Sequence, residues 1–281
     1  MQDNIWIIGC GDIGRRVAKL HKDYKISAIV HSATSVLACE KLGISASAID
    51  FDQEITLPEN IPSSIYYFMP PPSTGLEDTR LKKFLDKISK HPSRIVLIST
   101  TGVYGDSKGA WIDENTLVKP KAERAHRRLS AEKQLINWAK QTGAEYMILR
   151  VPGIYAQDRL PLARLKKGLP IVKEAEAGWT NRIHADDLAQ ACKAAMQCSY
   201  SNQIINICDG NPSTMTDYFN QVADYASLPR PPQISMKEAE RTLSAGMVSY
   251  LKESRRVANK KMLSLLKIKL QYPNLKSSLD S

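Results

Sequence analysis

Residues 5–14 read Ile-Trp-Ile-Ile-Gly-Cys-Gly-Asp-Ile-Gly, an apolar run that leads directly into a G-x-G-x-x-G motif. In a strand-to-helix turn of this kind, Gly9 permits the tight turn and Gly11 lets a pyrophosphate approach the backbone. Gly14 allows the helix to pack closely on the strand. The alternative is a glycine-rich turn without a ligand. The cofactor-binding residues predicted from this motif are Gly9, Gly11, Asp12, Ile13 and Gly14.

Beyond this turn, short apolar runs alternate with longer amphipathic stretches. Strands that alternate with helices indicate parallel β-α-β units. We therefore predict an α/β fold: a Rossmann-type doubly wound parallel sheet of about seven strands, which binds ligands beyond the carboxyl ends of its strands. The predicted strands are 5–8, 26–30, 46–49, 65–69, 95–99, 145–150 and 203–208, and the helices between them are 14–22, 35–42, 76–90, 125–141 and 185–197.

Two regions do not follow this alternation: 156–178, which is rich in Arg, Lys and Pro, and everything after Gly210. We expect them to form a smaller C-terminal substrate domain, in which 235–251 and 259–266 are helical. The predicted division is a dinucleotide-binding domain over 1–155 plus about 179–210, and a substrate-type domain over 156–178 and 211–281.

The composition, 43% hydrophobic and 24% charged, excludes wholesale disorder and a membrane bundle. The five cysteines are scattered and form no C-x-x-C pair, so they indicate neither a zinc site nor a disulfide framework. We predict no metal and a reducing, cytoplasmic location. The N-terminus lacks a basic region followed by a long apolar segment, so we interpret it as a first strand and not as a signal peptide.

The net charge of +10 favours anionic partners, such as phosphorylated cofactors. From Arg241 onward there are nine basic residues and two acidic ones. Dispersed lysines are typical of a solvated helix face, and Tyr250 and Tyr272 are too few aromatics for a nucleic-acid stacking platform. We therefore expect a small anionic molecule as the partner, and neither nucleic acid nor a membrane.

The end of the second predicted strand bears on the choice of cofactor. Dehydrogenases that prefer NAD place Asp or Glu there to bind the ribose 2′-hydroxyl, whereas this chain has His31 and Ser32. No carboxylate there would repel a 2′-phosphate, and Arg15 and Arg16 follow the third glycine, so the sequence favours NADP over NAD. Asp50, after the third strand, is a candidate acceptor for the adenine amine or a cap for the next segment.

Several further motifs are more specific than the glycine turn. They are Ile98-Ser99-Thr100-Thr101-Gly102-Val103-Tyr104-Gly105-Asp106, Pro120, Leu129-Ser130-Ala131-Glu132, Ile148-Leu149-Arg150-Val151-Pro152 and Arg182-Ile183-His184-Ala185-Asp186-Asp187. Together with the glycine motif, they resemble those of the extended short-chain dehydrogenase/reductases, the NAD-dependent epimerase/dehydratase family, over nearly the whole chain to about Asp209. Within that family the chain is most similar to the atypical YeeZ-like branch, which shares the glycine spacing and the closing Tyr272-Pro273.

This resemblance implies that Thr100 polarises the substrate's carbonyl or hydroxyl. The family's Tyr-x-x-x-Lys, which moves a proton and holds the nicotinamide ribose, falls here on Arg124 and Arg128. Arginine stays protonated near neutrality, so Arg124 cannot carry a proton, while Arg128 could still hold ribose or phosphate. Tyr104 is the best substitute proton carrier, although tyrosines at this position are more often structural. Three other residues near the predicted cleft are alternative proton carriers: Tyr155, His126 and His184. We expect His126 to face solvent, and His184 to pack against or cap a helix.

The resemblance also implies that loops after two strands line the cofactor: Met69 and Pro70 near the pyrophosphate and ribose, and Val151, Pro152 and Gly153 near the nicotinamide carboxamide. Both loops could instead be simple sheet connections. A basic cluster in the predicted substrate domain could grip a phosphorylated substrate or be solvated surface; it comprises Arg159, Arg164, Lys166 and Lys167.

The sequence thus predicts an NAD(P)-binding oxidoreductase-like protein, with hydride transfer on an anionic sugar or aldehyde. The alternative is a non-catalytic dinucleotide-binding sensor or scaffold, motivated by the loss of both Tyr and Lys. Members of this family often form homodimers through the helices predicted here over 76–90 and 125–140. A homodimer is one expectation, but Arg127, Arg128 and Lys133 make the second helix unusually basic, so the sequence leaves the oligomeric state open.

Overall fold

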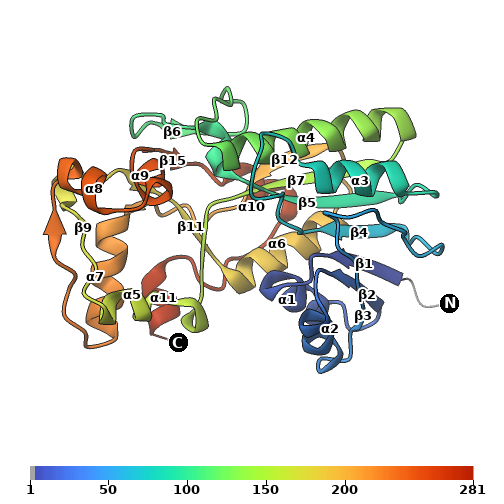
Figure 1. The fold of residues 1–281 in the computed structure, drawn as a ribbon, viewed down its shortest axis with the longest axis horizontal. Coiled ribbons are helices and arrows are strands. Elements are labelled where there is room, and N and C mark those ends of the chain that lie inside the picture. Colours follow the sequence, from blue (N-terminus) through green and yellow to red (C-terminus); the bar gives the residue numbers. More distant parts are fainter. Residues whose placement is uncertain (1–3, 281) are drawn as a thin grey trace.

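The computed structural model describes residues 4–280. At its centre is one parallel sheet of seven strands in the order β12-β7-β5-β4-β1-β2-β3 (Figure 1). The strand order reverses between β1 and β4, and such a switch point is where open α/β sheets bind ligands. The predicted Rossmann-type fold is confirmed. The strands are β1 (Asn4–Ile8), β2 (Lys25–Val30), β3 (Ser45–Ala48), β4 (Ser64–Tyr67), β5 (Arg94–Thr100), β7 (Glu145–Val151) and β12 (Gln203–Asn206).

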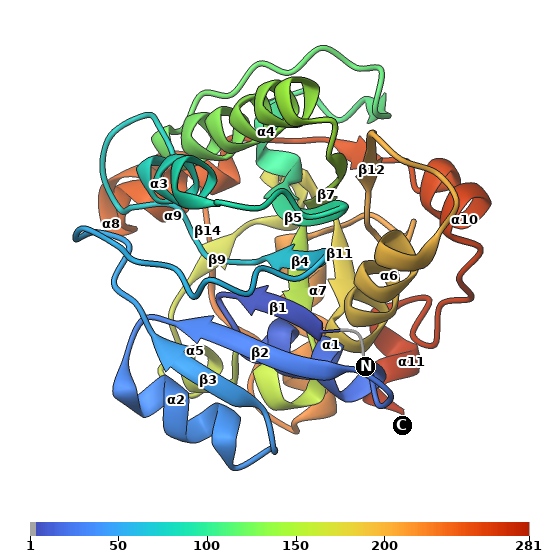
Figure 2. The same cartoon turned by 90° about the vertical axis from the view of Figure 1, so that its right-hand side faces the viewer.

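Helices cover both faces of this sheet (Figures 1 and 2). Because successive side chains of a strand point to opposite faces, Ile7 packs in one core with Val17, and Ile8 packs in the other core with Leu135. The first core is covered by α1 (Asp12–Leu20), α2 (Ala33–Glu40), α6 (Ala185–Gln197) and α10 (Lys260–Leu266), and the second by α3 (Thr79–Lys87) and α4 (Glu123–Thr142).

A second, smaller part lies beyond the carboxyl ends of the central strands (Figure 1). It has its own apolar core, in which Phe219 and Val222 pack with Leu165 and Leu275. Its helices are α5 (Leu162–Lys166), α7 (Met215–Tyr225), α8 (Met236–Thr242), α9 (Ala245–Leu251) and α11 (Leu275–Leu279). Its loops pair with one another through short strands of two residues each. β9 (Ile171–Val172) pairs with β14 (Gln233–Ile234), and β10 (Trp179–Thr180) pairs with β13 (Ser213–Thr214).

The prediction of one helix over 235–251 is wrong, because this stretch forms α8 and α9. Ser244 separates them: its hydroxyl accepts a hydrogen bond from the Met247 amide at 3.4 Å and begins a new helix. Serine competes for backbone hydrogen bonds and therefore favours a cap over a helix interior. The helix predicted over 259–266 is confirmed as α10, but its Met262 and Leu266 pack in the core of the central sheet.

A buried histidine makes the stability of this fold pH-dependent. His21 follows α1, and its Nε2 lies 2.7 Å from the Tyr66 hydroxyl. Burial, with the charge of Lys193, lowers the pKa of His21 to about 4. Because the pKa of His21 is lower in the folded state than in the unfolded state, where it is about 6.5, protonation of His21 favours unfolding. Its contribution to the free energy of unfolding is therefore fully present above about pH 6.5 and is lost as the pH falls toward 4.

We therefore expect the free energy of unfolding to fall by about 1–3 kcal/mol through this histidine between pH 7 and pH 4. Urea denaturation at both pH values, compared between the wild type and His21→Gln, measures the effect. The variant should show a flatter pH dependence, and the control His126→Gln should behave as the wild type. An equal pH dependence in His21→Gln would contradict this assignment.

Candidate functional site

The glycine turn joins β1 to α1 in a geometry that each glycine explains separately. Gly9 has φ +85°, and a Cβ there would lie 2.5 Å from the Met69 backbone nitrogen. A Cβ on Gly14 would lie 3.1 Å from Cγ2 of Ile7, so glycine allows α1 to pack closely on β1. A Cβ on Gly11 would meet nothing within 4 Å. Of these three glycines, Gly11 is therefore the one that no neighbouring atom of the described residues requires.

The start of α1 is open to an anion. Gly11 occupies the N-cap position in an extended conformation, and no side chain caps the helix. The amide groups of the first turn have no partner within a helix, and they carry the positive end of the helix dipole. The described glycine turn therefore has the properties of a phosphate-binding helix start.

The ends of β2 and β3 lie together, as the cofactor prediction requires. His31 follows β2, and its Nδ1 is 3.5 Å from Oδ1 of Asp50, which follows β3. Ser32 caps α2, its hydroxyl accepting from the Ser35 amide at 3.3 Å. The Asp50 carboxylate therefore lies beside the end of β2, where His31 and Ser32 take the place of the usual Asp or Glu.

Arg16 does not point toward this edge. Its guanidinium contacts three carboxylates: Asp12 at 3.1 Å, Asp158 at 2.9 Å and Asp186 at 2.7 Å. Since these partners neutralise it, Arg16 gives no support to a 2′-phosphate site. The NADP preference thereby loses one of its two arginines, because the sequence could not show that Asp158 and Asp186 pair with Arg16.

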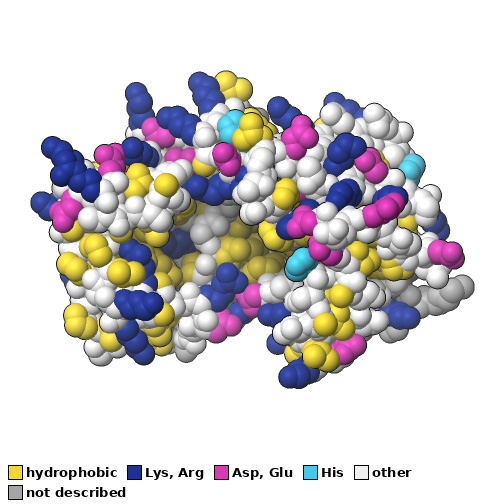
Figure 3. Space-filling view, viewed as in Figure 1, with side chains coloured by type: hydrophobic (Ala, Val, Ile, Leu, Met, Phe, Trp, Pro, Cys, Tyr) yellow, Lys and Arg dark blue, Asp and Glu magenta, His cyan; other side chains and the backbone are white. Residues whose placement is uncertain are grey.

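Thr100 ends β5 and lies in a cavity of about 150 Å³ together with Arg124 and Pro152. Its hydroxyl accepts a hydrogen bond from the Gly102 amide at 3.1 Å. A neighbouring cavity of about 300 Å³ is lined by Thr100, Arg124 and Arg128. The space-filling view shows a hollow between the two parts of the molecule, with Lys and Arg side chains along its walls (Figure 3). The fold therefore brings four of the predicted residues to one place.

The two arginines that replace the family's Tyr and Lys differ in their freedom. Arg128 is fixed, because its Nη1 donates to the carbonyl oxygens of Ile98 at 3.0 Å and Met69 at 3.4 Å. Arg124 is exposed and has one long hydrogen bond, of 3.4 Å, to the Ser249 hydroxyl. Arg128 thus ties the loop that contains Met69 and Pro70 to β5, while Arg124 faces the cavity.

Tyr104 lies away from these cavities. It is 2% exposed, its hydroxyl donates to Oδ1 of Asn206 at 2.8 Å, and burial raises its pKa. The guanidinium of Arg150 lies over its ring at 4.8 Å. This position favours the structural role over the predicted role as proton carrier, because Tyr104 lines neither of the cavities that contain Thr100.

The model of the NAD dependent epimerase/dehydratase family matches residues 10–208. The chain belongs to this family. The match covers most of the central sheet, the glycine turn from its second residue, and Thr100. A comparison with curated proteins gave no match.

Solved structures share this fold over nearly the whole chain. A functionally unknown conserved protein from Silicibacter pomeroyi is 26% identical, with a TM-score of 0.84, over 99% of this chain and 97% of that one. A UDP-glucuronic acid 4-epimerase from Bacillus cereus, in complex with NAD, is 16% identical (TM-score 0.79; 99% and 96% covered). A UDP-glucose 4-epimerase from Thermotoga maritima, with UDP-glucose, is 17% identical (TM-score 0.78; 98% and 96% covered).

Two family motifs meet in a buried ion pair. Glu132 accepts hydrogen bonds from Arg150 at 3.1 and 2.7 Å and from the Ser99 hydroxyl at 2.5 Å. The two charged side chains are 2% and 5% exposed. Burial alone would lower the pKa of Arg150, but the hydrogen bonds and charge of Glu132 outweigh it and raise that pKa. This pair fixes α4, with Arg124 and Arg128, against β7.

The remaining candidates of the sequence analysis have structural contacts. His184 caps α6, its Nδ1 accepting from the Asp186 amide at 3.2 Å, as one of the two predicted alternatives proposed. Tyr155 is buried and its hydroxyl lies 3.4 Å from the Tyr272 carbonyl. His126 lies on the outer side of α4, in a surface groove next to α3. None of these three lines the cavities that contain Thr100.

Sequence reasoning missed the residues that close the cavity from the C-terminal part. Glu253 lines both cavities beside Thr100. Its Oε2 accepts a hydrogen bond from Arg255 Nη1 at 2.7 Å, and the same nitrogen donates to the Gly105 carbonyl at 2.7 Å. No motif marks this segment; the one signal was an acidic residue within a basic tail. The other missed lining residues are Trp179, Thr180, Asn181 and Tyr250.

Within residues 4–280, no group of three or more His, Cys, Asp or Glu side chains is placed to hold a metal ion. The same residues include no helix with both the length and the apolar character needed to cross a membrane. All five cysteines are free thiols.

Proposed function

We propose that this protein binds an NAD-type dinucleotide at the glycine turn and acts as an oxidoreductase on an anionic sugar or aldehyde. The observation that carries the proposal is the open, uncapped start of α1 at Gly11, on the same sheet edge as the cavity around Thr100. Gly9, Gly11 and Gly14 would receive the pyrophosphate, with Met69 and Pro70 beside it. Val151 and Pro152, at the end of β7, would lie beside the nicotinamide.

The adenosine end of the dinucleotide would lie at His31, Ser32 and Asp50. Ser32 and the absence of a carboxylate directly after β2 favour NADP, whereas the Asp50 carboxylate beside His31 favours NAD. With Arg16 committed to three aspartates, we expect NAD to bind at least as well as NADP. The epimerase from Bacillus cereus, whose structure contains NAD, supports the same choice.

When bound, the nicotinamide supplies the oxidising group, and the chain must supply a proton carrier. Glu253 is the carboxylate that lines the cavities with Thr100. Its Oε2 accepts the hydrogen bond from Arg255, whereas none of the hydrogen bonds among the described residues involves its Oε1. We therefore assign proton transfer to Glu253 and orientation of the substrate oxygen to Thr100. Carboxylates are among the groups that perform general acid-base catalysis.

The charge of the cleft favours an anionic substrate. Arg124, Arg127, Arg128 and Arg255 line the two cavities, and Glu253 is their one carboxylate among the described lining residues. Arg124 has the most freedom to bind a phosphate or carboxylate, since its guanidinium has one weak partner. A sugar nucleotide such as UDP-glucose, which the Thermotoga maritima structure contains, has this chemistry.

The test is reduction of NAD, followed by absorbance, across a panel of nucleotide sugars and aldehydes. We expect Thr100→Ala and Glu253→Gln to lower kcat by about 10²–10⁴-fold. Tyr104→Phe should keep kcat near the wild-type value, because the Tyr104 hydroxyl contacts Asn206 and Arg150 and the residue lines neither cavity beside Thr100. Glu240→Gln, a carboxylate paired with Lys252 in the same part of the molecule, is the matched control.

The non-catalytic sensor remains the second candidate function, because Arg124 and Arg128 occupy the positions of the proton carrier and its lysine. Dinucleotide binding without turnover of any member of the panel would favour this candidate. Turnover lost in Thr100→Ala would exclude a purely binding role.

A further inference from the structure

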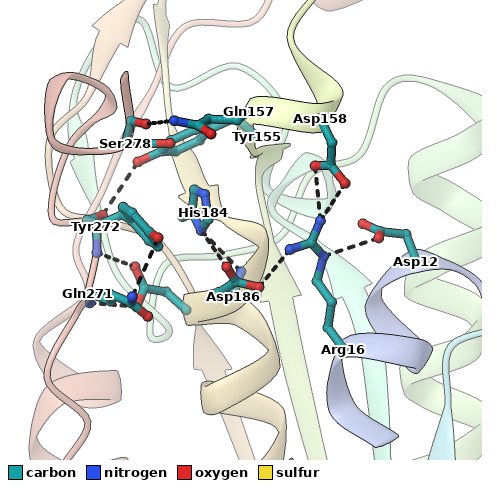
Figure 4. Close-up of polar contacts among 11 residues, drawn as sticks. Asp12, Arg16, Tyr155, Gln157, Asp158, His184, Asp186, Gln271, Tyr272 and Ser278 are labelled. Atoms are coloured by element: carbon teal, nitrogen blue, oxygen red, sulfur yellow. Dashed lines mark hydrogen bonds and ion pairs between the residues drawn. The ribbon is translucent and has the colours of Figure 1, made fainter. Parts of the chain in front are cut away.

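A cluster of ion pairs joins the start of α1 to the segment after β8 (Gly153–Tyr155), where the chain enters the C-terminal part. Arg16 lies between Asp12, Asp158 and Asp186, as Figure 4 shows. Arg159 Nη1 contacts the other carboxylate oxygen of Asp12, Oδ2, at 2.7 Å. Two arginines and three aspartates leave the cluster with one net negative charge.

This cluster lies directly at the predicted phosphate site, since Asp12 is the first residue of α1 and follows the open position of Gly11. Burial raises the pKa of the Asp12 carboxyl, but the hydrogen bonds and charges of Arg159 and Arg16 outweigh it and lower that pKa. Asp12 is therefore ionised at neutral pH, and its negative charge stands beside the amide groups that would receive a pyrophosphate.

The two arginines differ in how firmly they are held. Arg16 is 20% exposed and contacts three carboxylates, so its guanidinium is committed. Arg159 is 38% exposed, and its side chain has one partner among the described residues, Asp12. An exposed ion pair of this kind is weak, whereas an arginine binds phosphate through short, charge-assisted hydrogen bonds. A phosphate near Asp12 can therefore compete for Arg159.

We propose that Arg159 is a pyrophosphate-binding residue supplied by the C-terminal part, which exchanges its ion pair with Asp12 for the dinucleotide phosphate. Asp12 then acts as a competitor that lowers the affinity. Arg16, with Asp158 and Asp186, holds the segment in place during the exchange. This inference rests on the proposed binding of a dinucleotide, and it assigns a phosphate contact to a residue outside the glycine motif.

Isothermal titration calorimetry of the full chain at low salt, with NAD and with ADP-ribose, tests the proposal. Arg159→Met should weaken both ligands about tenfold, and Asp12→Asn should tighten both several-fold. Adenosine, which lacks the pyrophosphate, should bind equally to the wild type and both variants. Arg230→Met is the matched control, because Arg230 forms a 2.7 Å exposed ion pair with Asp224 in the C-terminal part.

The outcomes separate the two proposals. If the wild type binds NAD and Arg159→Met binds it equally well, the role of Arg159 is refuted while the proposed function stands. If Arg159→Met weakens adenosine as much as NAD, the arginine acts on the structure of the site and not on the pyrophosphate, which also refutes its role. If the wild type binds no dinucleotide, the proposed function fails and this inference fails with it.

Discussion

Gly11→Val should abolish measurable dinucleotide binding without lowering the thermal stability of the protein. A Cβ at this position meets no atom of the described residues within 4 Å, and the backbone is extended with a negative φ of −78°. Valine would therefore fit the folded protein. It would fill the space through which a pyrophosphate approaches the amide groups of α1.

We expect NAD affinity to fall by roughly a hundredfold or more, which is about 2.7 kcal/mol. Calorimetry gives the affinity, and thermal denaturation gives the stability. Gly246→Val is the matched control, because Gly246 also has open space around its Cα but lies in α9, away from the glycine turn. By contrast, Gly9→Ala should lower stability, since its Cβ would collide with the Met69 backbone at a positive φ. Unchanged NAD affinity in Gly11→Val would contradict the proposed site.

Glu132→Ala should destabilise the protein by about 3–5 kcal/mol, because it leaves the Arg150 guanidinium buried without its counterion. The Ser99 hydroxyl also loses its acceptor. Urea denaturation at neutral pH measures the change in the free energy of unfolding. Such a loss of stability would show that Glu132 holds α4 against β7, and with α4 the side chains of Arg124 and Arg128 in the cleft.

A second variant separates the buried charge from the loss of packing. The double variant Glu132→Ala/Arg150→Met removes both charges and should recover part of the lost stability. Asp86→Ala breaks an exposed ion pair with Lys82 of the same 2.7 Å length and should leave stability unchanged within error. A Glu132→Ala protein as stable as Asp86→Ala would show that the buried pair does not stabilise the fold.

The central sheet was predictable because its signal is local. Most of the seven strands are short apolar runs, β3 (Ser-Ala-Ser-Ala) being the exception, and the parallel order follows from the helices between most of them. The paired two-residue strands were not predictable, since β6 (Trp111–Ile112) meets β15 (Arg256–Val257) across more than a hundred residues and neither has a pattern of its own. The helix α7 was also missed, although Thr214 caps it through the Asp217 amide.

The candidate site was predictable to the extent that motifs mark it. Thr100, Pro152 and Arg124 meet in one cavity, as the family motifs implied. Glu253 joins them from the C-terminal tail, where its position depends on Arg255 and the Gly105 carbonyl and not on any local pattern. The partners of Tyr104 and Arg16 decide their roles, and those partners are distant in sequence: Asn206 for the tyrosine, and Asp158 and Asp186 for the arginine.

Calorimetric titration of the wild-type chain with NAD and NADP is the most direct test of the proposed dinucleotide site. One molecule of dinucleotide bound per chain, with NAD at least as tight as NADP and binding lost in Gly11→Val, is the predicted result. A wild-type protein that releases no heat with either dinucleotide, and that carries none after purification, would contradict the proposal that the glycine turn holds a cofactor.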